Sequence, residues 1–354
     1  MSKIWIIEIE RLENRYSIEW ADHIPKLLRS KGHDVTVISG PTNIPEATTP
    51  GAFLNFGGTN VQKSNQLEQI SRMFCSGEIK SGDHFLFTDF WNPSVISVKY
   101  MSELLGIPVT LHALIHAGGY DPQDFLGRLI GTKEKWLSYA EQSMFFAYDH
   151  VYFATNFHKD LFLKAYPHKG EDIGPLRIIR CGHPYEYMEQ ILKPYQTIPK
   201  ENIILFPHRI APEKQVEIFR DLAKYIPEMK FIVCQDTPLT KHEYHTLLAK
   251  SKMVFSCALQ ETLGICNGSE GPLLGAIPLS PDRLSYSEIF KNHRDFLYPS
   301  VWTQDWKSYE RNRKNLVERI RFLLSLYDRG ITKDYIDNSY PKYFRSHGMM
   351  RFFK

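Results

Sequence analysis

The segment Ile203-Ile204-Leu205-Phe206-Pro207-His208-Arg209-Ile210-Ala211-Pro212-Glu213-Lys214 decides the fold, because it leads from a short apolar run into a helix-like stretch. A wholly apolar run of this length is typical of a strand buried on both faces of a parallel sheet. Strands that alternate with helices predict such a sheet, with helices on both of its faces. The elements expected next are a helix over Glu213 to Lys224, a strand at Lys230 to Val233, a helix over His242 to Lys250 and a strand at Met253 to Ser256.

The same rhythm fills the first half of the chain. Ile4-Trp5-Ile6-Ile7 is an apolar run like a buried strand, and a helix-like stretch from Ile18 to Ser30 follows it. Gly32 suits the position just after that helix, where a left-handed residue ends many helices. Further strands are expected at 35–38, 85–87, 107–111 and 151–154, with helices over 95–105 and 159–165.

A polar segment from Leu192 to Lys200, with prolines at 194 and 199, is the expected linker. The sequence therefore predicts an α/β protein of two doubly wound, Rossmann-like domains, residues 1–192 and 200–330. A C-terminal tail or helix, 331–354, follows them. Open α/β sheets bind ligands at the carboxyl ends of their strands, so a cleft between the two domains is the expected site.

The composition is that of an ordinary globular protein. Of 354 residues, 43% are hydrophobic and 23% are charged, and the net charge is +3. These values exclude a disordered chain, a collagen-like fibre and a small disulfide scaffold. The five cysteines form no C-x-x-C pair, which argues against a structural zinc site and predicts a reducing, cytoplasmic location. No stretch approaches the ~20 apolar residues of a membrane span, so no membrane partner is expected.

Arg209 and Lys214 form the first candidate site. They flank the expected start of a helix, where Pro212 costs little because the N–H groups of a first turn have no intrahelical partner. A helix N-terminus with two cations can bind a diphosphate, since backbone N–H groups and positive side chains both attract phosphate oxygens. The alternative is an arginine and a lysine on the solvated edge of a helix.

Glu261 and Glu270 form the second candidate site. Glu261 lies in Gln260-Glu261-Thr262-Leu263-Gly264-Ile265, after the strand expected to end at Ser256, and Glu270 begins Glu270-Gly271-Pro272. Carboxylates at these positions can accept hydrogen bonds from the hydroxyls of a sugar and of a ribose, and Gly264 permits close approach of the backbone. The alternative is a Gly-rich loop whose acids cap a helix.

Together and in this order, the two elements resemble the retaining GT-B glycosyltransferases of the glycogen synthase type, over roughly residues 203–290. That family carries an R-x4-K pair for the donor diphosphate, which Arg209 and Lys214 match. In its E-x7-E motif, Glu261 resembles the first glutamate, which contacts the transferred sugar, and Glu270 the second, which holds the ribose. The resemblance implies the GT-B fold, transfer without a metal, and further donor contacts from the loop residues Leu263, Gly264 and Ile265.

The chain departs from the family pattern at two places. Eight residues, not seven, separate Glu261 from Glu270, which implies a one-residue insertion within Cys266 to Ser269. The downstream Gly275-x-x-Pro278 favours Glu270 over Ser269 as the second acid. The family often has a Gly-Gly pair after the first strand, whereas this chain has Glu8-Ile9-Glu10-Arg11-Leu12.

His116 is the catalytic candidate of the first domain. It lies in the segment 112–122, after the strand expected at 107–111, and the family places a histidine near the sugar after such a strand. His112 is the rival match, and one of the two is expected to be structural. Asp121 could bind or deprotonate an acceptor hydroxyl, or simply start a turn, as Asp-Pro often does. Asp89 lies at the end of another expected strand, and it too could act on the acceptor hydroxyl or have only a structural role.

The predicted function is transfer of a sugar from a nucleotide-diphosphate sugar to an acceptor hydroxyl with retained configuration. The expected catalytic residues are His116, Glu261 and Asp121. A UDP-sugar is expected in preference to a GDP-sugar, and no tightly bound cofactor is expected. The stretch from Asp83 to His158 also resembles glycosyltransferases of tailed bacteriophages, which implies a hydroxymethylated pyrimidine of DNA as acceptor. The alternative acceptors are an RNA nucleoside, a glycan or a small molecule; the first is considered because Pro281 to Ile289 resembles a subgroup that modifies nucleosides in RNA. The alternative class of protein is a non-catalytic nucleotide-sugar-binding protein.

Charge bears on the DNA acceptor. Residues 1–195 hold 19 Lys and Arg against 22 Asp and Glu, whereas the rest of the chain holds 24 against 18. A negative first half is unusual for a duplex-binding protein, so a local basic rim would be required. The tail, 331–354, is rich in Tyr, Lys and Arg; it is expected to pack on the first domain, with nucleic-acid contact as the alternative.

Overall fold

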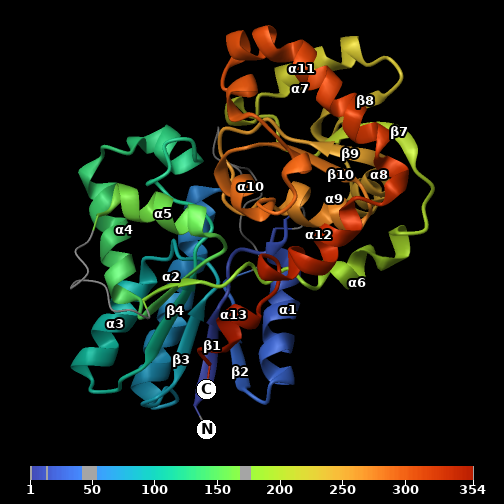
Figure 1. Cartoon of the computed structure of the whole chain (residues 1–354). Coiled ribbons are helices and arrows are strands. Elements are labelled where there is room, and N and C mark those ends of the chain that lie inside the picture. Colours follow the sequence, from blue (N-terminus) through green and yellow to red (C-terminus); the bar gives the residue numbers. More distant parts are fainter. Residues whose placement is uncertain (1, 13–14, 42–53, 168–176, 354) are drawn as a thin grey trace. The chain divides into compact units, whose positions relative to one another are not determined.

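The computed structural model describes residues 2–12, 15–41, 54–167 and 177–353. They divide into two compact units, of which the first comprises Met1–Phe153, Lys159–Cys181 and His347–Lys354, and the second Ala154–His158 and Gly182–Ser346. Each unit has its own parallel sheet (Figure 1). The segment 192–200, expected as the linker, lies within the second unit, which begins again at Gly182.

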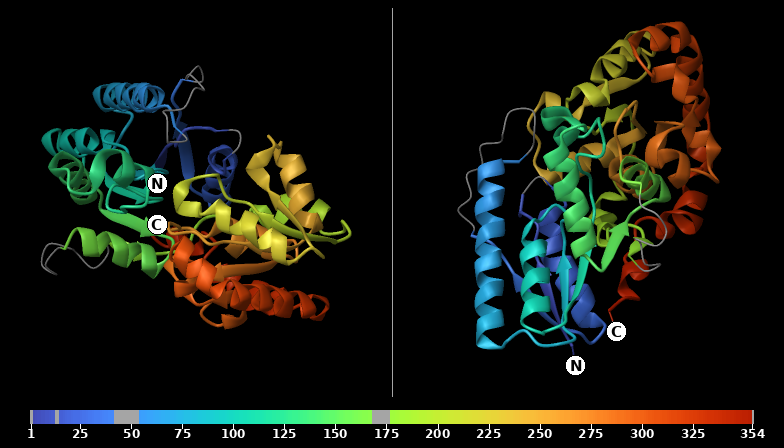
Figure 2. Two further views of the ribbon diagram at one scale, coloured as in Figure 1. Left: turned by 90° about the horizontal axis from the view of Figure 1, so that it is seen from above. Right: turned by 90° about the vertical axis from the view of Figure 1, so that its left-hand side faces the viewer.

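The first unit contains a six-stranded parallel sheet in the order β2-β1-β3-β4-β5-β6. Its strands are β1 (Lys3–Ile7), β2 (Asp34–Ile38), β3 (His84–Phe87), β4 (Thr110–Leu114), β5 (His150–Phe153) and β6 (Ile178–Arg180). The helices between them are α1 (Ser17–Ser30), α2 (Phe56–Ser76), α3 (Ser94–Leu104), α4 (Lys135–Ala147) and α5 (Asn156–Ala165). The chain steps one way from β1 to β2 and then the opposite way from β3 to β6. Because such crossovers are right-handed, α1 covers one face of the sheet and the later helices cover the other (Figure 2).

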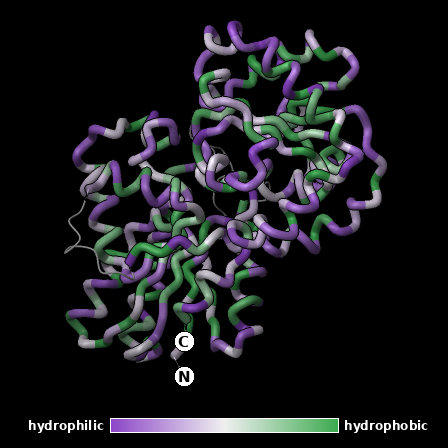
Figure 3. Tube along the Cα trace, in the orientation of Figure 1, coloured by the Kyte–Doolittle hydropathy of each residue, from purple (hydrophilic) through white to green (hydrophobic). Residues whose placement is uncertain are grey.

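The core of the first unit follows from strand alternation. Phe85, Phe87, Leu111, Ala113 and Val151 point to one face, where they pack against buried residues of the later helices such as Ile70, Val95, Phe145 and Phe162. The intervening residues His84 and His112 point to the other face. Apolar segments accordingly concentrate along the strands (Figure 3). Gly32 follows α1 with φ of +88°, as its sequence position predicts.

The second unit repeats this winding with a five-stranded parallel sheet in the order β11-β10-β9-β7-β8. Its strands are β7 (Glu201–Phe206), β8 (Lys230–Val233), β9 (Ser251–Phe255), β10 (Ile277–Pro281) and β11 (Leu297–Tyr298). Its helices are α6 (Met188–Leu192), α7 (Val216–Leu222), α8 (Lys241–Lys250), α9 (Gly271–Leu273), α10 (Leu284–Ile289), α11 (Trp306–Ser325) and α12 (Thr332–Asn338). The two doubly wound sheets confirm the predicted fold class.

The equivalent winding creates an equivalent switch point in each sheet. In the first unit, the chain leaves β1 toward β2 on one side and returns to β3 on the other. In the second unit, β8 and β9 flank β7 in the same way. Ligands of open α/β sheets bind where the winding reverses, outside the carboxyl ends of the strands. The loops after β1, β3 and β4, and those after β7 and β9, are therefore the places to look for a site.

Two expected elements are displaced. The strand expected at 107–111 begins only at Thr110. Pro108 has no N–H to pair with a neighbouring strand, and the N–H of Ile107 instead donates to the carbonyl of Ser102 at the end of α3. The helix expected from Glu213 begins at Val216, after a short 3₁₀ turn, Pro212–Lys214. Gln215 between them has φ of +53°, and its side-chain amide donates to the carbonyls of Cys257 and Thr303.

The C-terminal segment is shared between the units. Residues up to Ser346, including α12, cluster with the second unit, and His347–Lys354, including α13 (His347–Met350), cluster with the first. Phe353 packs on His112 with ring centroids 4.5 Å apart, and Phe352 packs on His150 at 5.3 Å. These two phenylalanines thus cover the histidine-bearing face of the first sheet. Lys354, the last residue of the expected tail, lies outside the described residues.

Candidate functional site

Lys214 is the centre of a charged cluster at the carboxyl ends of β7 and β9. The 3₁₀ turn after β7 carries it, and its side chain is buried. Its ammonium donates to the backbone carbonyl of Gln260 and lies 3.4 Å from the side-chain oxygen of the same residue. The ammonium also lies 3.5 Å from Oε2 of Glu261. The structure thus brings together Lys214 and Glu261, two of the residues singled out from the sequence.

Glu261 is held by its own loop. Its Oε1 accepts from the backbone N–H groups of Leu263, at 3.2 Å, and Gly264, at 3.0 Å. Burial by itself raises the pKa of this carboxyl. Lys214, His208 and the two backbone donors outweigh burial and hold the pKa of Glu261 below its ordinary value. Glu261 is therefore an ionised, oriented acceptor.

Gly264 is required for this loop. Its φ is +68°, in the left-handed region, and a Cβ there would lie 2.7 Å from Cδ1 of Ile289. Only glycine therefore fits the conformation that aims the N–H of residue 264 at Glu261. Ile265, the next residue, immediately precedes a π-helical turn.

Arg209 pairs with Glu213, four residues further along. Its Nε donates to Oε1 of Glu213 at 3.0 Å, and Nη2 makes a second, shorter contact with the same oxygen. Glu213 is buried, whereas about a quarter of the Arg209 side chain is exposed, 27%. The guanidinium carries five N–H donors, so it can bind a further anion while the pair with Glu213 persists.

Glu270 lies at the end of the π-helical turn Cys266–Glu270. Its Oε1 accepts from the hydroxyl of Tyr185 at 2.5 Å, and its Oε2 from the hydroxyl of Tyr244 at 2.6 Å. Two phenols thus fix the plane of a buried carboxylate. A carboxylate offers about four acceptor positions, so both oxygens retain capacity for further hydroxyl groups.

The π-helical turn coincides with the implied insertion. A π-helix closes its hydrogen bonds over one residue more than an α-helix, so such a turn absorbs one added residue without shifting the face on which later residues lie. The turn Cys266–Glu270 therefore has the geometry that the one-residue insertion implied by the resemblance would need, and the insertion itself stays a prediction.

His208 is a neighbour of this cluster that the sequence reasoning did not single out. Burial, then Lys214, lowers the pKa of its imidazole to about 3, so the ring is neutral at neutral pH. Its Nε2 is buried without a hydrogen-bond partner among the described residues. A neutral imidazole beside two cations adds no repulsion for them.

In the first unit, His116 lies just beyond the end of β4. Its Nε2 lies 2.8 Å from the carbonyl oxygen of Thr88, and its Nδ1 lies 2.6 Å from the hydroxyl of Tyr16. Because a carbonyl only accepts, Nε2 carries the proton and the Tyr16 hydroxyl donates to Nδ1. Burial lowers the pKa of His116, although Asp89 and the bond to Thr88 partly offset this. The ring is thus neutral and fixed in one orientation.

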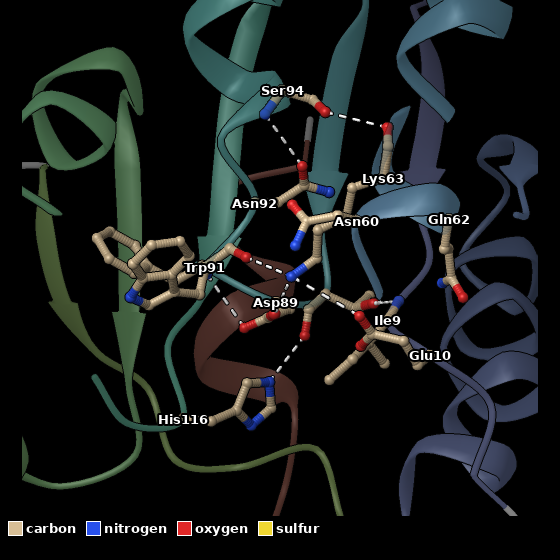
Figure 4. A network of polar contacts seen from close by, with 12 residues as sticks. Ile9, Glu10, Asn60, Gln62, Lys63, Asp89, Trp91, Asn92, Ser94 and His116 are labelled. Atoms are coloured by element: carbon tan, nitrogen blue, oxygen red, sulfur yellow. Dashed lines mark hydrogen bonds and ion pairs between the residues drawn. The ribbon is translucent and has the colours of Figure 1, made fainter. Parts of the chain in front are cut away.

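Beside His116, three charged residues meet at the carboxyl ends of β1 and β3 (Figure 4). Lys63, from α2, donates to the backbone carbonyl of Trp91 at 2.6 Å. Its ammonium lies 3.4 Å from Oδ2 of Asp89 and 3.7 Å from Oε1 of Glu10. All three side chains are at most one-fifth exposed. We call this set the Glu10–Lys63–Asp89 group.

A second buried carboxylate extends this network. The indole of Trp91 donates to Oε1 of Glu141 at 2.7 Å, and the backbone N–H of Gly119 donates to the same oxygen at 2.6 Å. The hydroxyl of Tyr166 donates to Oε2 at 2.5 Å. Burial raises the pKa of Glu141 despite these three donors. Glu141 therefore fixes the Gly118-Gly119 segment that follows His116.

The other two candidates of the first unit are placed differently. His112 lies inside β4, not after it, and is fully buried; its Nδ1 and Nε2 contact the Tyr152 hydroxyl and His84 at 2.8 and 2.9 Å. Burial holds its pKa well below the ordinary value. Oδ1 of Asp121 accepts from the backbone N–H of Gln123 at 2.9 Å, which is the bond of an Asx turn.

Sequence reasoning missed Lys63, Glu141 and the two tyrosines that hold Glu270. Glu10 was named only within a loop that departs from the family pattern. A lysine in mid-helix and an isolated glutamate carry no local signal of a site. They become recognisable only when the fold brings separated segments to one edge of the sheet.

Among the described residues, no three or more His, Cys, Asp or Glu side chains gather in a way that could hold a metal ion. None of the helices in residues 2–12, 15–41, 54–167 and 177–353 combines the length and the apolar character needed to cross a membrane.

No protein-family model matches the sequence, and no curated protein sequence is significantly similar to it. Solved structures are similar in fold along nearly the whole chain. The sucrose-phosphate synthase of Thermosynechococcus elongatus is 13% identical, with a TM-score of 0.63 over 97% of this chain and 95% of the other. Anabaena HepE, solved with UDP and glucose, is 13% identical, with a TM-score of 0.58 over 97% and 96%. A glycosyltransferase of Rickettsia africae is 13% identical, with a TM-score of 0.57 over 99% and 96%.

These similarities show the fold. The two parallel-sheet α/β units of this chain match the GT-B structures of glycosyltransferases over almost their entire length. The predicted GT-B fold is thereby confirmed.

Proposed function

We propose that this chain is a glycosyltransferase that moves a sugar from a UDP-sugar to an acceptor hydroxyl. The GT-B fold supports the reaction class, and one structural neighbour, HepE, is described in complex with UDP and glucose. The single observation that carries the proposal is the pair of buried Lys214 and partly buried Glu261, 3.5 Å apart at the switch point of the second sheet.

In the proposed mechanism, Lys214 and Arg209 bind the donor diphosphate and stabilise the negative charge that grows on it as the glycosidic bond breaks. These two cations supply the stabilisation without a metal. Helix α7 adds little, because it begins two residues after Lys214 and has only seven residues.

Two carboxylates orient the donor in this proposal. Glu261 is ionised and fixed by the backbone of its loop, and it accepts hydrogen bonds from hydroxyls of the transferred sugar. Glu270 is held by Tyr185 and Tyr244, and its remaining lone pairs accept hydrogen bonds from the ribose hydroxyls. Leu263, Gly264 and Ile265 belong to the same loop and contact the donor through their backbone, because glycine allows its close approach.

His116 and Asp121 complete the proposed catalytic set from the first unit. Because Thr88 and Tyr16 occupy both ring nitrogens of His116, its backbone carbonyl is the group that steadies the sugar as positive charge develops on the anomeric carbon. Front-face attack lets a phosphate oxygen of the leaving group take the acceptor proton, so the configuration is retained and no strong protein base is needed. Asp121 binds the acceptor hydroxyl in this scheme.

The proposed acceptor is a hydroxymethylated pyrimidine of DNA. The resemblance of residues 83–158 to bacteriophage glycosyltransferases supports it. A base turned out of the helix presents its hydroxymethyl group to an active site. Because the first half of the chain has a negative net charge, this acceptor requires a local basic rim to bind the DNA phosphates.

Incubation with a panel of UDP- and GDP-sugars tests the proposal. We expect slow release of UDP from one UDP-sugar without acceptor. With DNA containing 5-hydroxymethylcytosine or 5-hydroxymethyluracil, we expect a nucleoside mass increased by one sugar residue. NMR of the product should show the anomeric configuration of the donor, and EDTA should leave the rate unchanged. If no nucleotide sugar is consumed, the glycosyltransferase assignment fails; if a donor is consumed but hydroxymethylated DNA is not modified, only the DNA acceptor fails.

A further inference from the structure

The Glu10–Lys63–Asp89 group is a set of buried charges that the proposed mechanism does not use. It lies at the carboxyl ends of β1 and β3, the switch point of the first sheet, where open α/β sheets bind ligands. The backbone also links it to His116, because Nε2 of His116 contacts the carbonyl of Thr88, the residue before Asp89. The group therefore lies beside the proposed catalytic histidine.

Lys63 is incompletely bonded within this group. An ammonium has three donors. One is used by the carbonyl of Trp91 at 2.6 Å, and Oδ2 of Asp89 lies at 3.4 Å. Oε1 of Glu10 is 3.7 Å away, which is beyond the range of a hydrogen bond.

Glu10 faces this gap with an unused oxygen. The residue is more than nine-tenths buried, at 6% exposure, and its Oε1 has no hydrogen-bond partner in the part of the chain that the structure describes. Burial raises the pKa of Glu10, although Lys63 opposes this. Buried carboxylate oxygens are costly unless something satisfies them, so an orphaned one at a switch point indicates a ligand.

A hydroxyl group fits this gap. The ammonium of Lys63 and Oε1 of Glu10 are 3.7 Å apart, so one oxygen atom can lie ~2.8 Å from both of them at the same time. It would accept from the ammonium and donate to the carboxylate. Figure 4 shows the Glu10 and Asp89 carboxylates on either side of the lysine, so a second hydroxyl can reach Asp89, whose side chain is 19% exposed.

We propose that the Glu10–Lys63–Asp89 group is a further acceptor subsite, in addition to Asp121, and that it takes an uncharged, hydroxyl-bearing part of the acceptor. This inference rests on the proposed transfer to a hydroxyl. Two carboxylates against one ammonium repel a phosphate and attract hydroxyl protons. The subsite therefore selects an uncharged sugar or a hydroxymethylated base over a sugar phosphate.

The test measures the binding of three probes to the full chain saturated with UDP, by isothermal calorimetry. The probes are 5-hydroxymethyl-2′-deoxycytidine and methyl α-glucopyranoside, which are uncharged, and glucose 6-phosphate. We expect one uncharged probe to bind and glucose 6-phosphate to bind at least tenfold more weakly. Glu10→Ala should weaken the uncharged probe about tenfold or more, and Lys63→Met should do so as well.

Two controls separate binding from folding. Glu68→Ala and Arg72→Met remove an exposed ion pair on the same helix as Lys63, and we expect them to change no probe affinity. Glu10→Ala leaves Lys63 bonded to Trp91 and paired with Asp89, so its melting temperature should stay near that of the wild type. The rate of UDP-sugar hydrolysis should also be unchanged in Glu68→Ala and Arg72→Met, because neither residue belongs to the proposed sites.

The outcomes distinguish this inference from the proposed function. Binding of glucose 6-phosphate as tight as that of the uncharged probes would overturn the subsite, and so would unchanged probe affinity in folded Glu10→Ala. Failure of every uncharged probe to bind the wild type would also overturn it and would leave the gap to a bound water. Failure to bind UDP or to consume any nucleotide sugar would instead refute the donor assignment, and the probe affinities, measured without UDP, would still decide the subsite.

Discussion

The two units place charged clusters at the same point of the same winding, yet they build them differently. In the second unit, Lys214 and Glu261 come from loops after adjacent strands, and backbone N–H groups orient the carboxylate. In the first unit, Glu10, Lys63 and Asp89 come from a loop, a helix and a second loop, and side chains face one another across a gap. In the second unit the backbone satisfies Oε1 of Glu261, whereas in the first unit Oε1 of Glu10 has no hydrogen-bond partner among the described residues.

This difference agrees with the roles proposed for the two clusters. A cluster fixed by the backbone suits a ligand that is always the same, such as a diphosphate with its ribose. A cluster built from side chains can change with the acceptor without altering the sheet. The five predictions below test this comparison and the placement of the residues around it.

Removing Lys214 should have the largest effect. Lys214→Ala withdraws the buried cation from the proposed diphosphate site, and we expect UDP-sugar consumption to fall by on the order of 10²–10³-fold. The pKa of Glu261 should rise at the same time, because Lys214 is the main group that lowers it. Lys224→Ala is the control, since Lys224 is an exposed partner of Asp221. Full consumption by Lys214→Ala would show that the second cluster is not the donor site.

His112 should matter for stability rather than for transfer. His112→Ala removes a fully buried ring that contacts Tyr152, His84 and Phe353, and we expect the free energy of unfolding to fall by about 3–4 kcal/mol. Urea denaturation measures this, with His242→Ala, at an exposed site, as control.

The same residue gives a pH dependence. His112 stays neutral in the folded chain, whereas an unfolded histidine takes up a proton below about pH 6.5. The free energy of unfolding should therefore fall as the pH drops from 7.5 to 5.5, and less steeply in His112→Ala. An unchanged slope would mean that His112 does not contribute.

Gly264 tests the backbone of the loop that holds Glu261, and Gly77 is its matched control. Both have positive φ, but a Cβ at 264 would meet Ile289 at 2.7 Å, whereas one at 77 would meet nothing within 4 Å. We expect Gly264→Ala to cost about 2–4 kcal/mol of stability and Gly77→Ala about 1 kcal/mol. Gly264→Ala should also weaken UDP-sugar binding, which calorimetry measures. Equal costs for the two variants would contradict the tight packing at 264.

Asp121 should show the smallest effect on stability. Asparagine preserves the oxygen that accepts from Gln123, so Asp121→Asn should change the free energy of unfolding by less than about 0.5 kcal/mol. Asp121→Ala, which loses that oxygen, should cost about 1 kcal/mol. Transfer that is lost in Asp121→Asn at unchanged stability would support a role on the acceptor hydroxyl; transfer that is retained would leave Asp121 as a turn residue.

Local sequence was sufficient for most strands and helices of the fold, but it failed where tertiary bonds decide. The apolar run 107–111 looks like a strand, yet pairing with β3 starts at Thr110, which moves His112 into the sheet and leaves His116 beyond its end. The helix expected from Glu213 is interrupted because Gln215 reaches the carbonyls of Cys257 and Thr303. Neither partner is visible from the neighbouring sequence.

The sequence by itself determined the alternation of strands and helices, the two doubly wound sheets, and the spacing of Arg209, Lys214, Glu261 and Glu270. These features depend on periodicity and on residues close together in the chain. Only the tertiary structure decided that Lys63 meets Glu10 and Asp89, and that Tyr185 and Tyr244 hold Glu270. Such groups are brought together by strand order and by helix packing, because the loops at the carboxyl ends of parallel strands and the helices beside them become neighbours whatever their distance along the chain.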